Sequence, residues 1–184
     1  AMMGSGGLVV LDERDCMVDI ARYFLAFTQS QSCGRCTFCR VGTRRMLDIL
    51  DRICAGKGVA GDIERLEELA HSVAGASLCG LGRTAPNPVL STLRYFRSEY
   101  EAHLQGRCPA GKCRDLISYT IDEKCIGCTL CAQTCPTGAI PFAPHERHVI
   151  DDAACVRCDM CRTGCPTGAI KIVTGTERGR QCPR

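Results

Sequence analysis

The chain of 184 residues has no tryptophan, and its aromatic residues together make up only 5% of it. No apolar run approaches the ~18 residues needed to cross a membrane. The first seven residues carry no basic residue, so they do not look like a secretory signal peptide. No run of Lys and Arg with interleaved aromatic residues occurs. We therefore expect neither a membrane span nor a nucleic-acid partner.

Cysteine, in contrast, is abundant, with 17 residues in the chain. A small chain this rich in cysteine is either cross-linked by disulfides or loaded with metal. Three Cys-x2-Cys-x2-Cys runs occur, and this spacing is typical of iron–sulfur ligands rather than of disulfide frameworks. Because thiolate-bound clusters are sensitive to oxygen, we expect a reducing compartment, the cytoplasm.

The segment 12–105 has the periodicity of amphipathic helices, with apolar residues at spacings of three and four. Asp62 is expected to cap a third helix, and Asn87 a fourth, with Pro88 at its first helical position. A short strand is expected before them, at 8–11. Helices joined by short loops predict an up-down-up-down four-helix bundle. The apolar positions are Met17, Ile20, Ala21, Phe24 and Leu25; Met46, Ile49, Leu50 and Ile53; Ile63, Leu66, Leu69, Ala70 and Val73; and Leu90, Leu93, Phe96, Tyr100 and Leu104.

An internal repeat follows, in which residues 125–140 match residues 155–170. Each copy reads Cys-x2-Cys-x2-Cys-x3-Cys-Pro, the ligand run of bacterial two-cluster ferredoxins, in which the fourth cysteine binds the cluster of the other run. Zinc ribbons are the alternative, but they space their ligands in two separated pairs, often with histidine. The expected ligands are Cys125, Cys128, Cys131 and Cys165 for one 4Fe-4S cluster and Cys155, Cys158, Cys161 and Cys135 for the other.

These two clusters are expected in an α+β ferredoxin-like domain over residues 119–175, with β-prone segments at 119–121, 148–150 and 170–173. A linker, 106–118, would join it to the helical part. A polar tail would follow at 176–184. The chain is thus predicted to be multidomain.

A third 4Fe-4S cluster is expected in the helical part. Cys33, Cys36 and Cys39 lie between the first two expected helices and supply three ligands. Cys79 lies between the last two. In an antiparallel bundle both loops lie at the same end, so Cys79 is the expected fourth ligand.

Five cysteines remain, and three of them fit a zinc site at the opposite end of the bundle. His103, Cys108 and Cys113 follow one another at intervals of five, and either Cys16 or Cys54 can reach the same end. Three thiolates and one imidazole suit a tetrahedral zinc site that fixes the linker. The alternative is a set of ordinary reduced thiols. Cys182, in the tail, is expected to bind nothing.

Three segments of the sequence resemble one known family specifically. The segments 4–7 (Gly-Ser-Gly-Gly), 32–42 (Ser-Cys-Gly-Arg-Cys-Thr-Phe-Cys-Arg-Val-Gly) and 79–82 (Cys-Gly-Leu-Gly) resemble the C-terminal half of the flavin-carrying, NADH-binding subunit of respiratory complex I. Phe38 stands where that family generally has proline, at a position that is not a ligand. A two-cluster domain after 108–113 is not the complex I arrangement. It resembles the beta subunit of electron-bifurcating or NADP-reducing hydrogenases.

The resemblance implies that FMN and NAD(P)H bind to an upstream domain, of which residues 1–11 would be the end. No catalytic residue is then expected here, and any enzyme activity belongs to the whole subunit. The resemblance favours Cys16 over Cys54 as the zinc ligand. It also implies electron relay between the flavin and a ferredoxin or hydrogenase partner, within a multi-subunit complex. An NAD-dependent formate dehydrogenase or a complex I-like NADH dehydrogenase is the alternative, and a zinc-binding scaffold is an alternative of another class.

Overall fold

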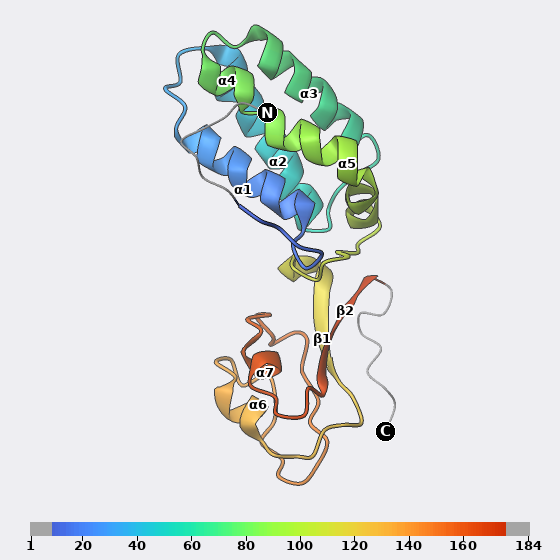
Figure 1. The fold of residues 1–184 in the computed structure, drawn as a ribbon. Coiled ribbons are helices and arrows are strands. Elements are labelled where there is room, and N and C mark those ends of the chain that lie inside the picture. Colours follow the sequence, from blue (N-terminus) through green and yellow to red (C-terminus); the bar gives the residue numbers. More distant parts are fainter. Residues whose placement is uncertain (1–8, 176–184) are drawn as a thin grey trace. The chain divides into compact units, whose positions relative to one another are not determined.

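The computed structural model describes residues 9–175, and the chain forms two compact units, Ala1–Leu116 and Ile117–Arg184. Figure 1 shows the elements of both units. In the part of the chain that is described, no helix is long and apolar enough to cross a membrane. The Gly4–Gly7 motif and Cys182 lie outside the described residues.

Unit 1 is helical and built around four long helices. They are α1 (Met17–Ser30), α2 (Thr43–Cys54), α3 (Asp62–Ala76) and α5 (Asn87–Leu104), with a π-helical turn η1 (Phe38–Gly42), a short helix α4 (Gly80–Thr84) and a 3-10 turn η2 (Arg114–Leu116). Helix α1 packs against α2 and α5, and α3 also packs against α2 and α5. Leu25, Met46, Leu50, Ile53 and Leu66 are fully buried between them. Since burying such a side chain stabilises a fold by about 1.5–3 kcal/mol, this aliphatic core supports unit 1.

The four long helices confirm the periodicity, but both helix caps were predicted one residue too late. The N-caps are Gly61 and Pro86, so Asp62 and Asn87 are the first helical residues and Pro88 is the second. Gly61 adopts φ +89°, a left-handed conformation that glycine allows without strain, and it turns the chain sharply into α3.

Two apolar predictions for unit 1 are wrong. Phe96 is 41% exposed because α5 is kinked at this residue (φ −132°, ψ 32°), which rotates its side chain out of the apolar face. Residues 9–11 form no strand, and Val10 is 83% exposed. An isolated apolar run cannot form a strand unless another strand pairs with it.

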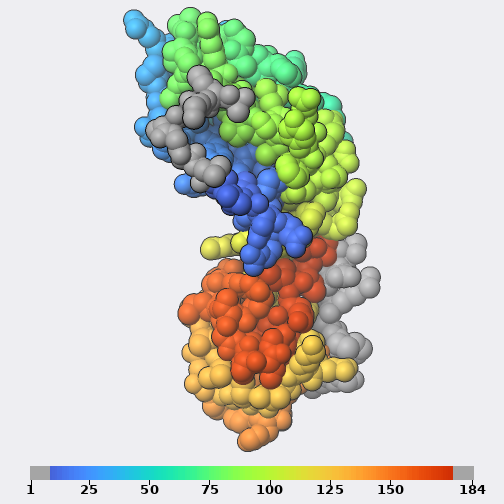
Figure 2. Space-filling model, viewed as in Figure 1, coloured from blue at the N-terminus to red at the C-terminus, as the bar shows by residue number. Residues whose placement is uncertain are grey.

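The helices and strands of unit 2 that the structure describes, up to residue 175, are all short. Strands β1 (Ile117–Ile121) and β2 (Ile170–Thr174) pair antiparallel, with Tyr119 opposite Ile172. Two helices, α6 (Leu130–Thr134) and α7 (Met160–Thr163), contact each other. In Figure 2 the amber-to-orange atoms of the first repeat and the red atoms of the second repeat lie next to each other on the visible face of unit 2. The third predicted strand, 148–150, is irregular rather than a strand, and the next residue is tied to the first repeat, with Asp151 N donating to Ala139 O at 2.8 Å.

Candidate iron–sulfur and metal sites

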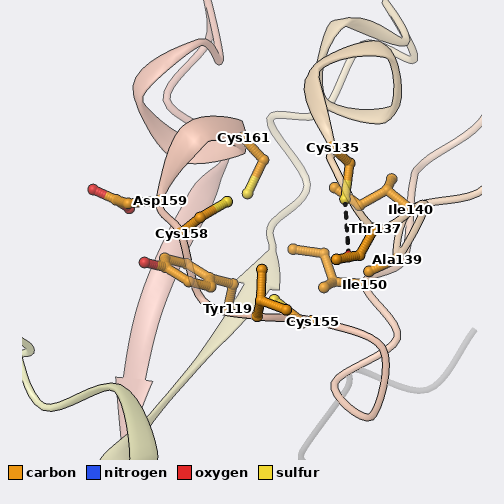
Figure 3. Close-up of a pocket in the computed structure, with 11 residues that line it drawn as sticks. Tyr119, Cys135, Thr137, Ala139, Ile140, Ile150, Cys155, Cys158, Asp159 and Cys161 are labelled. Atoms are coloured by element: carbon orange, nitrogen blue, oxygen red, sulfur yellow. Dashed lines mark hydrogen bonds between the residues drawn. The ribbon is translucent and has the colours of Figure 1, made fainter.

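Two cavities in unit 2 are lined by four cysteines each. One is lined by Cys125, Cys128, Cys131 and Cys165, with Ile121, Ile126, His148 and Ile170 among its other walls. The other is lined by Cys155, Cys158, Cys161 and Cys135, with Tyr119, Ile140 and Ile150. Figure 3 shows the second one, with Cys135 facing the other three sulfur atoms from the far side. Below, they are called the first and the second cavity.

Each cavity therefore combines three cysteines of one repeat with the fourth cysteine of the other repeat. The sequence predicts this grouping for two 4Fe-4S clusters. The chain achieves it because α6 and α7, which carry the third cysteine of the first and second runs, lie in contact. Cys135 follows α6 directly, and Cys165 lies just beyond the end of α7. Cluster binding by these eight residues stays a prediction.

The fourth cysteine of each run lies in a loop, Cys-Pro-Thr-Gly-Ala, that aims N–H groups at its sulfur. Burial raises the pKa of Cys135, but hydrogen bonds from Thr137, Ala139 and Gly138 outweigh it, and the pKa is lowered. The equivalent groups lower the pKa of Cys165 in the same way. Both loops need a left-handed glycine, Gly138 (φ +65°) and Gly168 (φ +61°). Such loops favour the thiolate form that binds iron.

The third cysteine of each run is buried. Burial raises the pKa of the Cys161 thiol to about 11, with further contributions from Cys155 and Cys158. Burial also raises the pKa of Cys131. Four thiolates crowded into an apolar cavity are unstable unless a cation neutralises them. Iron in a 4Fe-4S cluster would do so, and the all-cysteine donor set of each cavity fits that group.

In unit 1 the structure brings together the two segments that were expected to hold the third cluster, one with Cys33, Cys36 and Cys39 and one with Cys79. Cys39, which is buried, lies in η1, while Cys79 is the N-cap of α4, and η1 contacts both α3 and α4. A backbone hydrogen bond from Leu78, next to Cys79, lowers the pKa of Cys36. The predicted ligands Cys33 and Cys79 are exposed. The loops are close because Gly82 has no side chain, since a Cβ there would lie 2.6 Å from the Ser77 side chain and 3.1 Å from Cys39 Cβ.

A compact group of metal-binding side chains lies elsewhere in unit 1. Cys16, His103, Cys108 and Cys113 are all buried, and their ligand atoms lie within 4.8 Å of one another. His103 Nε2 is 3.3 Å from both Cys16 Sγ and Cys113 Sγ, which are 3.7 Å apart. A tetrahedral zinc ion with Zn–S bonds of about 2.3 Å would space its sulfur ligands about 3.8 Å apart. The group contains Cys16 and not Cys54.

The surroundings of His103 prepare it for a metal. Its Nδ1 lies 2.7 Å from the Glu99 carbonyl oxygen, so Nδ1 carries the proton and Nε2 faces the thiols. Burial alone would lower the pKa of His103. The Cys108 and Cys16 thiolates raise it by a larger amount, so that the pKa is about 10. The group therefore attracts positive charge, and its donor set fits zinc, which would replace the proton on Nε2.

Comparisons with known proteins agree with the cysteine pattern. Residues 19–103 match the NADH-ubiquinone oxidoreductase-F iron-sulfur binding region, and residues 119–172 match a 4Fe-4S dicluster domain. Over 150 residues, the chain is 50% identical to the NADP-reducing hydrogenase subunit HndC of Solidesulfovibrio fructosivorans, covering 80% of this chain and 31% of HndC.

Two further relatives match over shorter stretches. Identity to an NADH-quinone oxidoreductase subunit of Streptomyces coelicolor is 42%, over 59% of this chain and 24% of that protein. Identity to the NADP(+)-dependent formate dehydrogenase subunit beta of Moorella thermoacetica is 38%, over 62% of this chain and 16% of that protein. The chain thus spans about a third or less of these relatives. This chain is an iron–sulfur electron-transfer module in which an NADH-ubiquinone oxidoreductase-F iron–sulfur binding region is followed by a 4Fe-4S dicluster domain.

Proposed function

We propose that the module carries three 4Fe-4S clusters. The observation that carries this proposal is the pair of four-cysteine cavities in unit 2, each built from both repeats. The first cluster would be held by Cys125, Cys128, Cys131 and Cys165, the second by Cys155, Cys158, Cys161 and Cys135, and the third by Cys33, Cys36, Cys39 and Cys79. When bound, each cluster accepts and releases one electron at a time.

The fold class that we propose is an N-terminal four-helix bundle followed by a ferredoxin-like two-cluster domain. The mutual packing of α1, α2, α3 and α5 supports the bundle. The boundaries proposed for these parts are 12–105 and 119–175, with a linker at 106–118. Residues 1–11 would end an upstream flavin domain, and 176–184 would be a tail.

In the whole subunit, we propose that the helical cluster exchanges electrons with a flavin that reacts with NAD(P)H. The two clusters of unit 2 would then exchange electrons with a ferredoxin or a hydrogenase subunit of the same complex, in the cytoplasm. HndC is named as a subunit of an NADP-reducing hydrogenase, and the match to it covers most of this chain. A formate dehydrogenase or an NADH dehydrogenase is the alternative setting, because relatives with those names match as well.

The group of Cys16, His103, Cys108 and Cys113 is proposed to bind a structural zinc ion. The short distances among its ligand atoms and its complete burial support this proposal. Zinc would tie the loop 108–113 to the start of α1 and to the end of α5. A colourless protein that held zinc alone would instead be a scaffold.

Metal and spectroscopic analysis of anaerobically purified protein tests these proposals. Three clusters predict about twelve iron and twelve acid-labile sulfide per chain, with EPR signals after dithionite reduction. Besides iron, the protein should contain about one zinc ion per chain. Protein with zinc but without iron, sulfide or an EPR signal would contradict the electron-transfer proposal, whereas iron without zinc would contradict the zinc site alone.

A further inference from the structure

The two cavities of unit 2 are related by the repeat, but at one pair of equivalent positions the second cavity has a tyrosine and the first a histidine. The segment before the first cysteine run reads Tyr-Thr-Ile-Asp (119–122), and the one before the second reads His-Val-Ile-Asp (148–151). Asp122 N donates to Ala169 O, and Asp151 N donates to Ala139 O, both at 2.8 Å. These matching hydrogen bonds make Tyr119 and His148 structural equivalents. Each lines the cavity of the other run, with Tyr119 in the second cavity and His148 in the first.

His148 brings ring nitrogen atoms to the first cavity. The residue is 3% exposed, and its Nδ1 lies 3.7 Å from Cys125 Sγ. Its Nε2 is buried and has no hydrogen-bond partner among the described residues. A buried donor or acceptor without a partner is costly, so native proteins rarely leave one. An anionic cluster bound beside this ring would accept a hydrogen bond from it.

The segment that carries His148 is fixed to the first cysteine run. His145 N donates to Gly127 O at 3.0 Å, and the Arg147 guanidinium Nε donates to Ile121 O at 3.1 Å. Gly127 has φ +68°, and a Cβ there would lie 2.6 Å from His145 Cα. Only glycine permits this approach, so the backbone itself holds the imidazole against Cys125.

Tyr119 makes no comparable contact in the second cavity. In Figure 3 its hydroxyl points away from the four sulfur atoms. Burial and a hydrogen bond with Asp159 raise the pKa of Tyr119, so the phenol hydroxyl donates its hydrogen bond to the Asp159 carboxylate. That carboxylate also accepts from Arg162 at 2.6 Å, which neutralises it. The loops around Cys135 and Cys165 supply matching hydrogen bonds to their sulfurs, so they do not distinguish the cavities.

We infer that His148 donates an N–H hydrogen bond to the cluster of the first cavity and gives that cluster the higher reduction potential of the two in unit 2. The inference rests on the proposed function. Reduction adds a negative charge to the cluster, so an N–H donor stabilises the reduced form more than the oxidised form. With no such donor at Tyr119, the first electron to enter unit 2 resides in the first cavity.

Redox titrations of the anaerobic protein, followed by EPR, test the inference. His148→Leu should lower the potential of the more easily reduced cluster of unit 2 by about 59 mV, a tenfold change in the equilibrium constant for one electron. His148→Gln keeps an N–H donor and should recover part of that shift. Tyr119→Phe, the matched control, should change neither potential, while Tyr119→His should raise the lower one.

Iron and sulfide analysis of each variant separates the outcomes. Unchanged potentials in His148→Leu, with all clusters present, would overturn the inference and leave the proposed function standing. Wild-type protein without clusters would overturn both. If His148→Leu fails to assemble its cluster, Tyr119→His still decides, because a potential that does not rise in that variant contradicts the role of the imidazole.

Discussion

The two units of this protein are held together by different means. Unit 1 has an aliphatic core, to which helices of 12 to 18 residues contribute. Over its described residues, 117–175, unit 2 has two strands of five residues and α-helices of five and four residues. Two-stranded sheets and single helical turns are marginal in water. The core of unit 2 also includes Cys131 and Cys161, with four more predicted iron ligands packed against it.

The predicted iron ligands therefore have a different structural place in each unit, although Cys16, Cys108 and Cys113 belong to the core of unit 1. In unit 1 the predicted cluster ligands, among them Cys39 in η1 and Cys79 at the N-cap of α4, lie beside a core cluster that does not include them. In unit 2 six of the eight predicted ligands belong to the core or pack against it, so we expect iron binding and folding to be coupled there. The following predictions test this contrast, starting with the largest expected effect.

Removal of iron should unfold unit 2 and leave unit 1 helical. Chelation in the full chain would take away the cation that compensates the crowded thiolates of both cavities. Hydrogen exchange should show loss of protection in β1 and β2, while α2 and α3 stay protected. Protected strands in iron-free protein would show that unit 2 folds without clusters.

Loss of zinc should weaken one end of unit 1. Cys108→Ser removes a buried ligand and should abolish zinc binding, lowering the free energy of unfolding of unit 1 by several kcal/mol. Metal analysis and helical circular dichroism would measure both effects. Cys54→Ser is the matched control, since Cys54 lies outside the four-residue group, and it should retain zinc. Zinc lost from Cys54→Ser but kept by Cys108→Ser would reverse the assignment.

Truncation of the aliphatic core should destabilise unit 1 without affecting its metals. Leu50 is fully buried in α2, so Leu50→Ala should lower the free energy of unfolding by about 3 kcal/mol. Denaturant unfolding followed by helical circular dichroism measures the change. Val59→Ala, at an exposed site, should change it little. Loss of iron from folded Leu50→Ala would show that the core and the cluster site are not independent.

The smallest effect is expected at the start of α3. The Asp62 carboxylate accepts hydrogen bonds from Val59 N at 2.9 Å and from Arg52. Burial raises its pKa, but these partners lower it below the ordinary 3.8 on balance. The folded form therefore gains stability above that pH and loses it only in stronger acid. Asp62→Asn should cost about 1 kcal/mol.

That loss should be constant between pH 5 and pH 8, because Asp62 stays ionised throughout this range. Denaturant unfolding at both pH values measures it. A loss that shrinks toward pH 5 would mean that the folded pKa is raised rather than lowered.

Local sequence patterns predicted the helices well and their ends less well. The apolar spacing of residues such as Leu50 and Ile53 marks α2, since a helix repeats every 3.6 residues. The same reasoning failed at Phe96, because a kink depends on the contacts of the whole helix. It also missed α4 and η1, which are too short to show a period. The apolar run at 8–11 looked like a strand, but a strand needs a partner that spacing cannot reveal.

The sequence alone predicted which cysteines of each short run share a cluster, because covalent spacing holds residues three positions apart within reach of one cluster. It also indicated the exchange of Cys135 and Cys165, through the repeat. Only the tertiary structure placed Cys16 beside Cys113, 97 residues away, and left Cys54 outside that group. It alone turned His148 toward Cys125. Distances between remote residues depend on how helices and loops pack, and no local pattern encodes them.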